Sequence, residues 1–176
     1  MKTSRRFPTR AVPRPAFGLL AILTALLSAC AGYAPPSDLS PGASQTSVIA
    51  AMGPPALRLP LPDGSGTRLV FARGPMGAHT WMIDVDRAGQ VRHWHQALGE
   101  EQFARIRPGL SADDLLFALG PPAERRRMGW TPTEVWSYRF ADTQCRWFRI
   151  ELDRRQVVIA SDYAEDPLCR RPFWDW

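Results

Sequence analysis

The chain has 176 residues, and its 22 lysine and arginine residues exceed its 17 aspartate and glutamate residues, which gives a formal net charge of +5. Five of the basic residues lie before Cys30, so the 17 that follow balance the 17 acidic residues of the rest of the chain. Balanced charge offers no electrostatic reason to bind an anionic polymer, so we expect no nucleic-acid partner.

The N-terminal segment, residues 1–29, has the pattern of an export signal. Basic residues come first, an apolar run from Leu19 to Leu27 follows, and small residues precede Cys30. This order is typical of a secretory signal peptide. The tetrapeptide Leu27-Ser28-Ala29-Cys30 resembles the lipobox of bacterial lipoproteins, which implies that residues 1–29 are removed and that Cys30 is acylated. The apolar run is too short to cross a bilayer of about 30 Å as a helix.

Residues 30–40 contain alanine, proline and serine without a periodic pattern, and we expect them to form a lipidated tether. Ala31 follows the cysteine at the position where many lipoproteins retained in the inner membrane carry an aspartate. By that resemblance, we expect the protein in the outer membrane, anchored by its lipid and facing the periplasm.

The rest of the chain contains an internal repeat with an offset of 67 residues. Pro41-Gly42-Ala43-Ser44 corresponds to Pro108-Gly109-Leu110-Ser111, and Gly53-Pro54-Pro55-Ala56 recurs unchanged as Gly120-Pro121-Pro122-Ala123. Apolar positions keep the same offset without a gap over about fifty residues, which predicts a tandem duplication. The expected boundaries are 41–97 for the first repeat, 98–165 for the second repeat and 166–176 for a C-terminal tail.

Each repeat is expected to start with a short helix and to continue as three antiparallel strands. Ser44 and Ser111 stand at N-cap positions, and Gly53 and Gly120 stand at the C′ positions that follow. Alternating apolar and polar residues then indicate half-buried strands. The expected strands are 69–72, 80–85 and 91–95 in the first repeat, and 135–140, 147–152 and 157–160 in the second. A further helix is expected at 100–106. This order predicts an α+β fold of two helix-plus-meander units, with the helices packed on one face of each sheet.

Cys145 and Cys169 are the two cysteines that are left once Cys30 is acylated. Because the periplasm is oxidising, we expect them to form a disulfide, with two unpaired thiols as the alternative. Such a bond would close a loop of about 25 residues and contribute roughly 3 kcal/mol. No Cys-x-x-Cys spacing is present in the sequence, so neither a redox motif nor a zinc site is indicated.

The second repeat carries an ordered set of motifs over residues 98–163. These are the stretch from Phe103 to Ser111, then Leu119-Gly120-Pro121-Pro122, then Trp136-Ser137-Tyr138. In this order they resemble the SmpA/OmlA (BamE-like) family of outer-membrane lipoproteins. The resemblance implies a non-enzymatic accessory subunit of the barrel-assembly machinery. The presence of two copies rather than one is similar to the layout of secreted β-lactamase inhibitor proteins, in which paired sheets make a concave protein-binding surface.

No convincing catalytic set follows Cys30. His93 and His95 are two residues apart on an expected strand and so share a face, where His79 or Asp84 could complete a metal site. We favour the interpretation that they are ordinary strand histidines, and we expect no metal and no other cofactor. The sequence lacks a Gly-x-Ser-x-Gly elbow and a glycine-rich phosphate loop. It therefore predicts a protein that is not an enzyme, with a metal-dependent activity as the weakest alternative.

The surface of the sheets is the remaining basis for a function. The side chains expected to face the helices are Leu69, Phe71, Trp81, Ile83, Trp136, Tyr138, Phe148 and Ile150. The side chains expected on the opposite face, which form the candidate partner surface, are Met82, Arg92, Trp94, Trp147 and Arg149. Aromatic and arginine side chains are enriched in protein interfaces. The alternative is that the other sheet or the tail covers them as core.

The function expected from these features is that of a binding or scaffold module in outer-membrane protein assembly or envelope maintenance. Its partners would be the outer membrane, through the lipid on Cys30, and an envelope protein, with the barrel-assembly machinery as the first candidate. The alternative is an inhibitor-like protein that binds a periplasmic enzyme.

Overall fold

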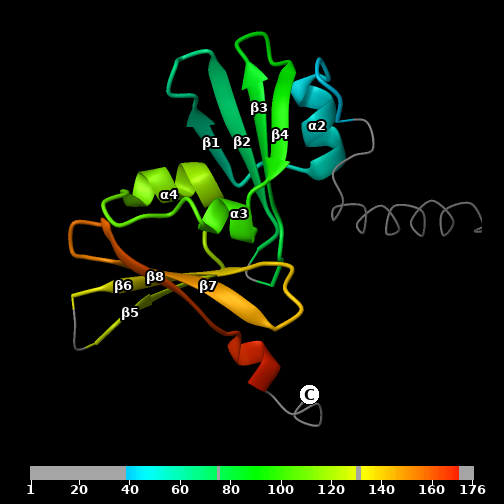
Figure 1. Ribbon diagram of the computed structural model, residues 1–176. Helices are drawn as coiled ribbons and strands as arrows, with labels where there is room; N and C mark the ends of the chain where they lie inside the picture. Colours follow the sequence, from blue (N-terminus) through cyan, green and yellow to red (C-terminus); the bar gives the residue numbers. More distant parts are fainter. Residues whose placement is uncertain (1–38, 75, 130–131, 171–176) are drawn as a thin grey trace, which may run out of the picture.

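The computed structural model describes residues 39–74, 76–129 and 132–170. In these ranges the chain forms two four-stranded antiparallel sheets with short helices, an α+β architecture (Figure 1). The first half consists of α2 (Gln45–Met52), β1 (Leu57–Pro60), β2 (Gly66–Ala72), β3 (Thr80–Asp86) and β4 (Val91–Gln96). The second half consists of α3 (Glu100–Phe103), α4 (Ala112–Leu119), β5 (Glu124–Arg127), β6 (Glu134–Arg139), β7 (Arg146–Leu152), β8 (Val158–Glu165) and the 3-10 helix η2 (Pro167–Arg170).

None of the helices in the described ranges has both the length and the apolar character needed to pass through a bilayer.

Both sheets are simple meanders, in the orders β1-β2-β3-β4 and β5-β6-β7-β8, so each has one strand more than the three expected. The additional strands are β1 and β5, at the edges. In β5 the sequence Glu-Arg-Arg-Arg has no apolar alternation to signal a strand. It is extended because it pairs with β6, where the Arg125 guanidinium carbon lies 4.1 Å from the centroid of the Trp136 ring. Pairing with a formed neighbour, rather than local pattern, makes β5 a strand.

The helices α2 and α4 are capped as their sequences predict. Ser44 Oγ accepts a backbone N–H from the first turn of α2 at 3.1 Å. Ser111 does the same for α4, and the Asp114 carboxylate accepts the Ser111 N–H at 2.8 Å, which completes a capping box. These hydrogen bonds from Ser111 hold the pKa of Asp114 below its ordinary value. Gly53 and Gly120 follow the two helices with φ of 79° and 78°, in the region that favours glycine.

The helix α3 is shorter than expected. It ends at Phe103, whereas the sequence predicted a helix over 100–106. Beyond it the chain tightens into three-residue turns, since the Arg105 N–H bonds to the Gln102 carbonyl and the Ile106 N–H bonds to the Phe103 carbonyl. Phe103 and Ile106 are nevertheless both buried, as the apolar pattern indicated.

Each sheet has one face packed on helices. In the first half, Val48 and Met52 of α2 pack on a core that includes Leu69, Phe71 and Ile83. In the second half, Phe103, Leu115 and Leu119 of α3 and α4 pack on a core that includes Trp136, Tyr138, Phe148 and Ile150. The buried Tyr138 hydroxyl donates to the Gly120 carbonyl at 3.1 Å, and burial raises the pKa of this phenol.

The C-terminal end of α4 also contacts the first sheet, on the face away from α2. Val70, Met82 and Ala97 are buried there. A Cβ placed on Gly120, at the end of α4, would lie 2.9 Å from side-chain atoms of both Val70 and Thr80. The order of layers is therefore α2, first sheet, α3 with α4, second sheet, as Figure 1 shows.

A partly buried arginine joins the two halves. Arg68 Nε and Nη2 each donate to the Asp84 carboxylate at 2.7 Å, and Arg68 Nη1 donates to the Phe117 carbonyl at 3.0 Å. The guanidinium carbon also lies 4.0 Å from the centroid of the Phe117 ring. The side chains of Arg68 and Asp84 are only 12% and 13% exposed. We call this group, Arg68 with Asp84 and Phe117, the arginine joint.

Candidate functional site: the outer face of the second sheet

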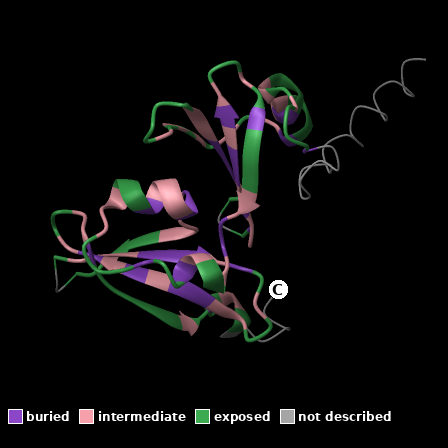
Figure 2. Cartoon of the chain, turned by 45° about the horizontal axis from the view of Figure 1, so that its top comes forward, coloured by how far each residue is buried: buried purple, intermediate pink, exposed green. Residues whose placement is uncertain are grey.

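The second sheet has one face on α3 and α4 and an outer face whose side chains alternate with the core residues of β6, β7 and β8. Cross-strand register places Ser137 opposite Arg149 and Arg149 opposite Asp162 on this outer face. Exposed residues follow almost the whole of β8, which forms the edge of the sheet (Figure 2). The outer face of the second sheet is thus a formed surface with an accessible edge strand.

The middle of the outer face is polar and paired. Arg149 Nε donates to the Asp162 carboxylate at 3.1 Å, and their side chains are 37% and 54% exposed. Beside this pair lies a depression of about 100 Å³. Its lining residues are Arg126, Met128, Val135, Ser137, Trp147, Arg149 and Glu151. Arginine and methionine around one depression are a composition typical of protein interfaces.

One end of the outer face is closed by η2. Arg139 pairs with the Asp166 carboxylate at the start of η2, and its guanidinium carbon lies 5.1 Å from the centroid of the Trp147 ring. Trp147 is only 3% exposed. This tryptophan is therefore part of the structure of the face and is not a free contact residue.

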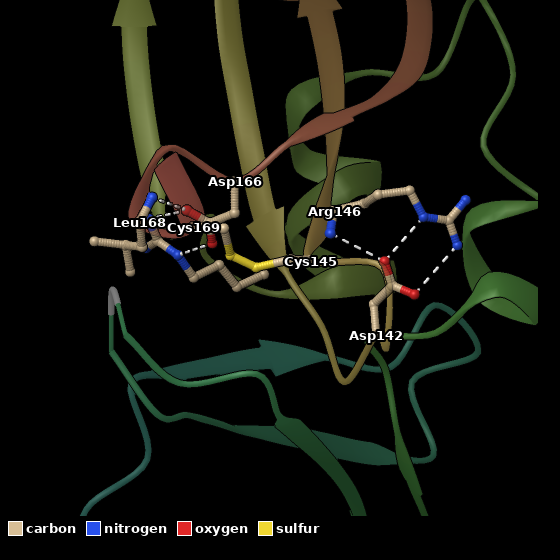
Figure 3. The surroundings of a disulfide bond; sticks show 7 residues. Asp142, Cys145, Arg146, Asp166, Leu168 and Cys169 are labelled. Atoms are coloured by element: carbon tan, nitrogen blue, oxygen red, sulfur yellow. Dashed lines mark hydrogen bonds and ion pairs between the residues drawn. A yellow bond between two sulfur atoms is a disulfide. The ribbon is translucent and has the colours of Figure 1, made fainter. Parts of the chain in front are cut away.

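The disulfide holds η2 in place. The structure joins Cys145 and Cys169, the expected pairing, with their Cα atoms 6.4 Å apart. Figure 3 shows the bond between the two cysteines. The Asp166 N–H also donates to the Cys145 carbonyl at 2.9 Å. The Leu168 N–H donates to the Asp166 side chain at 3.0 Å. The β6–β7 connection and the chain after β8 are thus fixed to each other.

Replacing both cysteines with serine is expected to lower the free energy of unfolding by about 2 to 3 kcal/mol, because the bond restricts a loop with a sequence separation of 24. Urea unfolding of the double variant against the unmodified protein measures the effect. Each single serine variant should lose as much stability as the double variant, since either one removes the bond. Equal midpoints for all four proteins would contradict the prediction.

A second polar contact orders the β6–β7 connection. The Asp142 carboxylate accepts hydrogen bonds from Arg146 Nε at 2.9 Å and from the Arg146 backbone N–H at 3.0 Å. Arg146 Nη2 also donates to Glu100 of α3 at 3.1 Å (Figure 3 shows Asp142 and Arg146). The hydrogen bond from the Arg146 side chain lowers the pKa of Asp142 from 3.8 to about 2.

We expect the contact between Asp142 and Arg146 to affect how the free energy of unfolding changes at acid pH. Because the folded pKa of Asp142 lies below the unfolded one, the contact stabilises the fold above the unfolded value of 3.8 and is lost as pH falls through about 2. Carboxyl carbon chemical shifts recorded against pH will report the folded pKa directly. Arg146→Gln should move that pKa back toward 3.8. An unchanged titration in this variant would show that Arg146 is not the cause.

The structure does not bring the five residues of the candidate partner surface together. Met82 faces away from α2 as expected, but it is 0% exposed because it packs with Val70 and Ala97, and Gly120 after α4 lies beside it. Trp147 and Arg149 do share the outer face of the second sheet. Arg92 is exposed and paired with Asp86 at 2.6 Å in the first half.

Trp94 lies on the wrong face for the prediction. It stands opposite Ile83, so it shares the α2 side of the first sheet, where its Nε1–H donates to the Leu39 carbonyl at 2.9 Å. The reason is a β-bulge, a shift of register between Asp84 and Val85 that strict alternation along β4 does not anticipate.

The histidines do not assemble a metal site. His93 and His95 share a face, with ring centroids 5.4 Å apart. His79 stacks with Trp81 on the α2 side, and the Asp84 carboxylate is bound by Arg68. Within the described ranges, no group of three or more histidine, cysteine, aspartate or glutamate side chains is arranged to hold a metal ion.

The arginine joint is the structural feature that the sequence-based prediction missed. The available signal was Arg68 on an otherwise apolar strand, with Asp84 as an acid on the next strand along.

The expected acylation of Cys30, the signal at 1–29 and most of the tether at 30–40 lie outside the described residues, as do residues 171–176 of the tail.

No protein-family model matches the chain. No curated protein matches it either. Among solved structures, it is similar to a DUF4309 family protein (YjgB) from Bacillus subtilis, at 15% identity and a TM-score of 0.28, over 70% of this chain and 79% of that one. It is similar to an extracellular protein containing an SCP domain from Bacillus anthracis, at 11% identity and a TM-score of 0.28, over 71% and 44%. It is also similar to a proposed β-lactamase inhibitor protein from Streptococcus mutans, at 12% identity and a TM-score of 0.30, over 82% and 96%. Likeness at these scores is too low to support a functional argument.

Proposed function

We propose that the chain is a non-catalytic lipoprotein of the outer membrane, facing the periplasm, that binds an envelope protein through the outer face of its second sheet. The lipobox-like tetrapeptide ending in Cys30 supports the anchor. The observation that carries the binding role is the outer face itself, where Arg149, Asp162 and the depression beside them are accessible.

The proposal includes a tandem duplication of a SmpA/OmlA-like unit. The offset of 67 residues seen in the sequence relates α2 to α4 and β1 to β5. It also relates the pair Leu69 and Ile83 to the pair Trp136 and Ile150. Even the β-bulge between Asp84 and Val85 recurs, between Glu151 and Leu152. Irregular features that repeat at one offset support descent from a single unit.

The two units are not equivalent as binding surfaces. In the first unit, the chain at the end of α4 contacts the face away from α2, and Met82 is buried there. In the second unit the corresponding face is the one that carries Arg149. We therefore place the partner on the second unit only, with the assembly or maintenance of the outer envelope as the process it serves.

The test is affinity purification of the full-length protein from detergent-solubilised envelopes. Recovery of barrel-assembly subunits with the acylated protein, but not with Cys30→Ala, is the expected result. Arg149→Ala should reduce that recovery, whereas the matched control Arg92→Ala, which removes another arginine from an ion pair with an aspartate, should not.

Other outcomes are equally informative. Recovery of a soluble periplasmic enzyme, independent of Cys30, would replace the proposal with the inhibitor-like alternative. Recovery of an envelope partner that is insensitive to Arg149→Ala would show that the outer face of the second sheet is not the binding surface.

A further inference from the structure

A cleft of about 390 Å³ lies between the first sheet and the helices of the second half. Arg68 and His95 line it from β2 and β4, while residues of the α3–α4 region form the opposite wall. This volume is within the range of small-molecule sites, which are concave and mostly apolar with a few polar groups. The arginine joint fixes the two walls relative to each other, so the cleft is already formed.

The floor of the cleft is apolar. Ile106, Leu110, Phe117 and Ala118 line it. Leu110, Phe117 and Ala118 are only partly buried, although Leu110 and Ala118 pack against the core of the second half. An apolar group placed on them would remove exposed apolar surface from water, which is favourable at about 25 cal/mol per Å².

The rim carries one cation that is free to change partner. Arg105 Nη2 bonds to Glu101 at 2.6 Å, but the two side chains are 71% and 76% exposed. Exposed pairs of this kind contribute little, so an anion in the cleft can displace Glu101 at small cost. The nearby Asp114 carboxylate does not compete for Arg105, because it is bound by the Ser111 N–H and hydroxyl.

His95 adds a neutral polar group to the wall. Its Nδ1 is buried and has no hydrogen-bond partner. Burial, followed by the nearby Arg68 charge, lowers the pKa of His95. The imidazole is therefore uncharged at neutral pH and brings no second positive charge to the cleft.

We propose that this cleft binds a small amphipathic carboxylate, with its apolar chain on the floor formed by Leu110, Phe117 and Ala118 and its carboxylate paired with Arg105. The proposal is independent of the partner surface on the second sheet. A short fatty acid and a peptide C-terminus with an apolar last residue share this chemistry, and different arms of the experiment separate them.

Calorimetric titration of the full-length protein with decanoate, kept below its micellar concentration, tests the site. We expect saturable binding of one decanoate per chain. Decanol, which has the same chain but no charge, should bind about tenfold more weakly, since an arginine–carboxylate hydrogen bond is lost. A tetrapeptide ending in phenylalanine, titrated in the same way, shows whether the site prefers a peptide source of the carboxylate.

Two variants locate the binding. Ala118→Leu fills the floor and should weaken decanoate at least about tenfold, while Arg105→Gln should weaken decanoate without affecting decanol. Arg92→Gln, at an exposed arginine of the first half, is the control and should bind as the unmodified protein does. Arg105 is on the surface, so its variant tests the site even if Ala118→Leu misfolds. Absence of saturable binding, or binding unchanged by Arg105→Gln, would overturn the proposal.

Discussion

Replacing Arg68 with alanine is expected to lower the free energy of unfolding by about 3 kcal/mol, the lower end of the cost of leaving one member of a buried ion pair without its partner, because this pair is partly buried. The Asp84 carboxylate, 13% exposed in the intact protein, would lose its two guanidinium donors. The Phe117 carbonyl would lose its donor as well. Denaturant unfolding monitored by tryptophan fluorescence measures the loss.

Two further variants show whether the lost charge pair is the cause. Arg92→Ala removes an arginine that is 67% exposed and paired with Asp86, and it should cost less than about 1 kcal/mol. Replacing both members of the joint, with Arg68→Met and Asp84→Leu together, should recover much of the loss, because no buried charge is then left alone. A double variant as unstable as Arg68→Ala would instead assign the effect to lost contact with Phe117.

Gly120→Ala is expected to be the second severe substitution, and Gly53→Ala its internal control. Both glycines end equivalent helices with nearly the same φ, 79° at Gly53 and 78° at Gly120. A side chain at either position is strained by about 1 to 3 kcal/mol. At Gly53 a Cβ would meet nothing within 4 Å, whereas at Gly120 it would lie 2.9 Å from Val70 Cγ1 and from Thr80 Cγ2.

The difference between the two variants therefore measures the contact between the halves. Overpacking of this kind typically costs a further 1 to 3 kcal/mol, roughly, so Gly120→Ala should be the less stable protein by that amount. Thermal unfolding of both variants under one set of conditions provides the comparison. Equal losses would mean that the first sheet yields to the added methyl group and that α4 is not tightly seated on it.

The local sequence pattern correctly predicted the helices and strands whose formation depends on neighbouring residues. Alternation in β2, β3, β6 and β7 and the caps at Ser44 and Ser111 all signal their structures within a few residues. The edge strand β5 has no such signal, because its extended form comes from pairing with β6.

The candidate site was harder to predict because it depends on contacts between distant residues. Alternation alone placed Met82 and Trp94 on one open face. The docking of α4 buries Met82, and a register shift of one residue carries Trp94 to the other side. Neither the docking of α4 nor the register shift can be predicted from the few residues around Met82 or Trp94. Arg149, on a regular strand of the second sheet, was placed correctly by the same reasoning.

The helix layer between the sheets makes the two halves unequal during synthesis. The second half carries both helices of its own core, while the first half has α2 alone and contacts the end of α4 with its other face. The ribosome synthesises the first half first. Val70, Met82 and Ala97 therefore stay exposed to water until about twenty more residues, up to the end of α4, have been added. During this interval the nascent chain has a sheet with an exposed apolar face. A chaperone would be needed most in that interval, and truncation after β4 would leave this apolar surface exposed permanently.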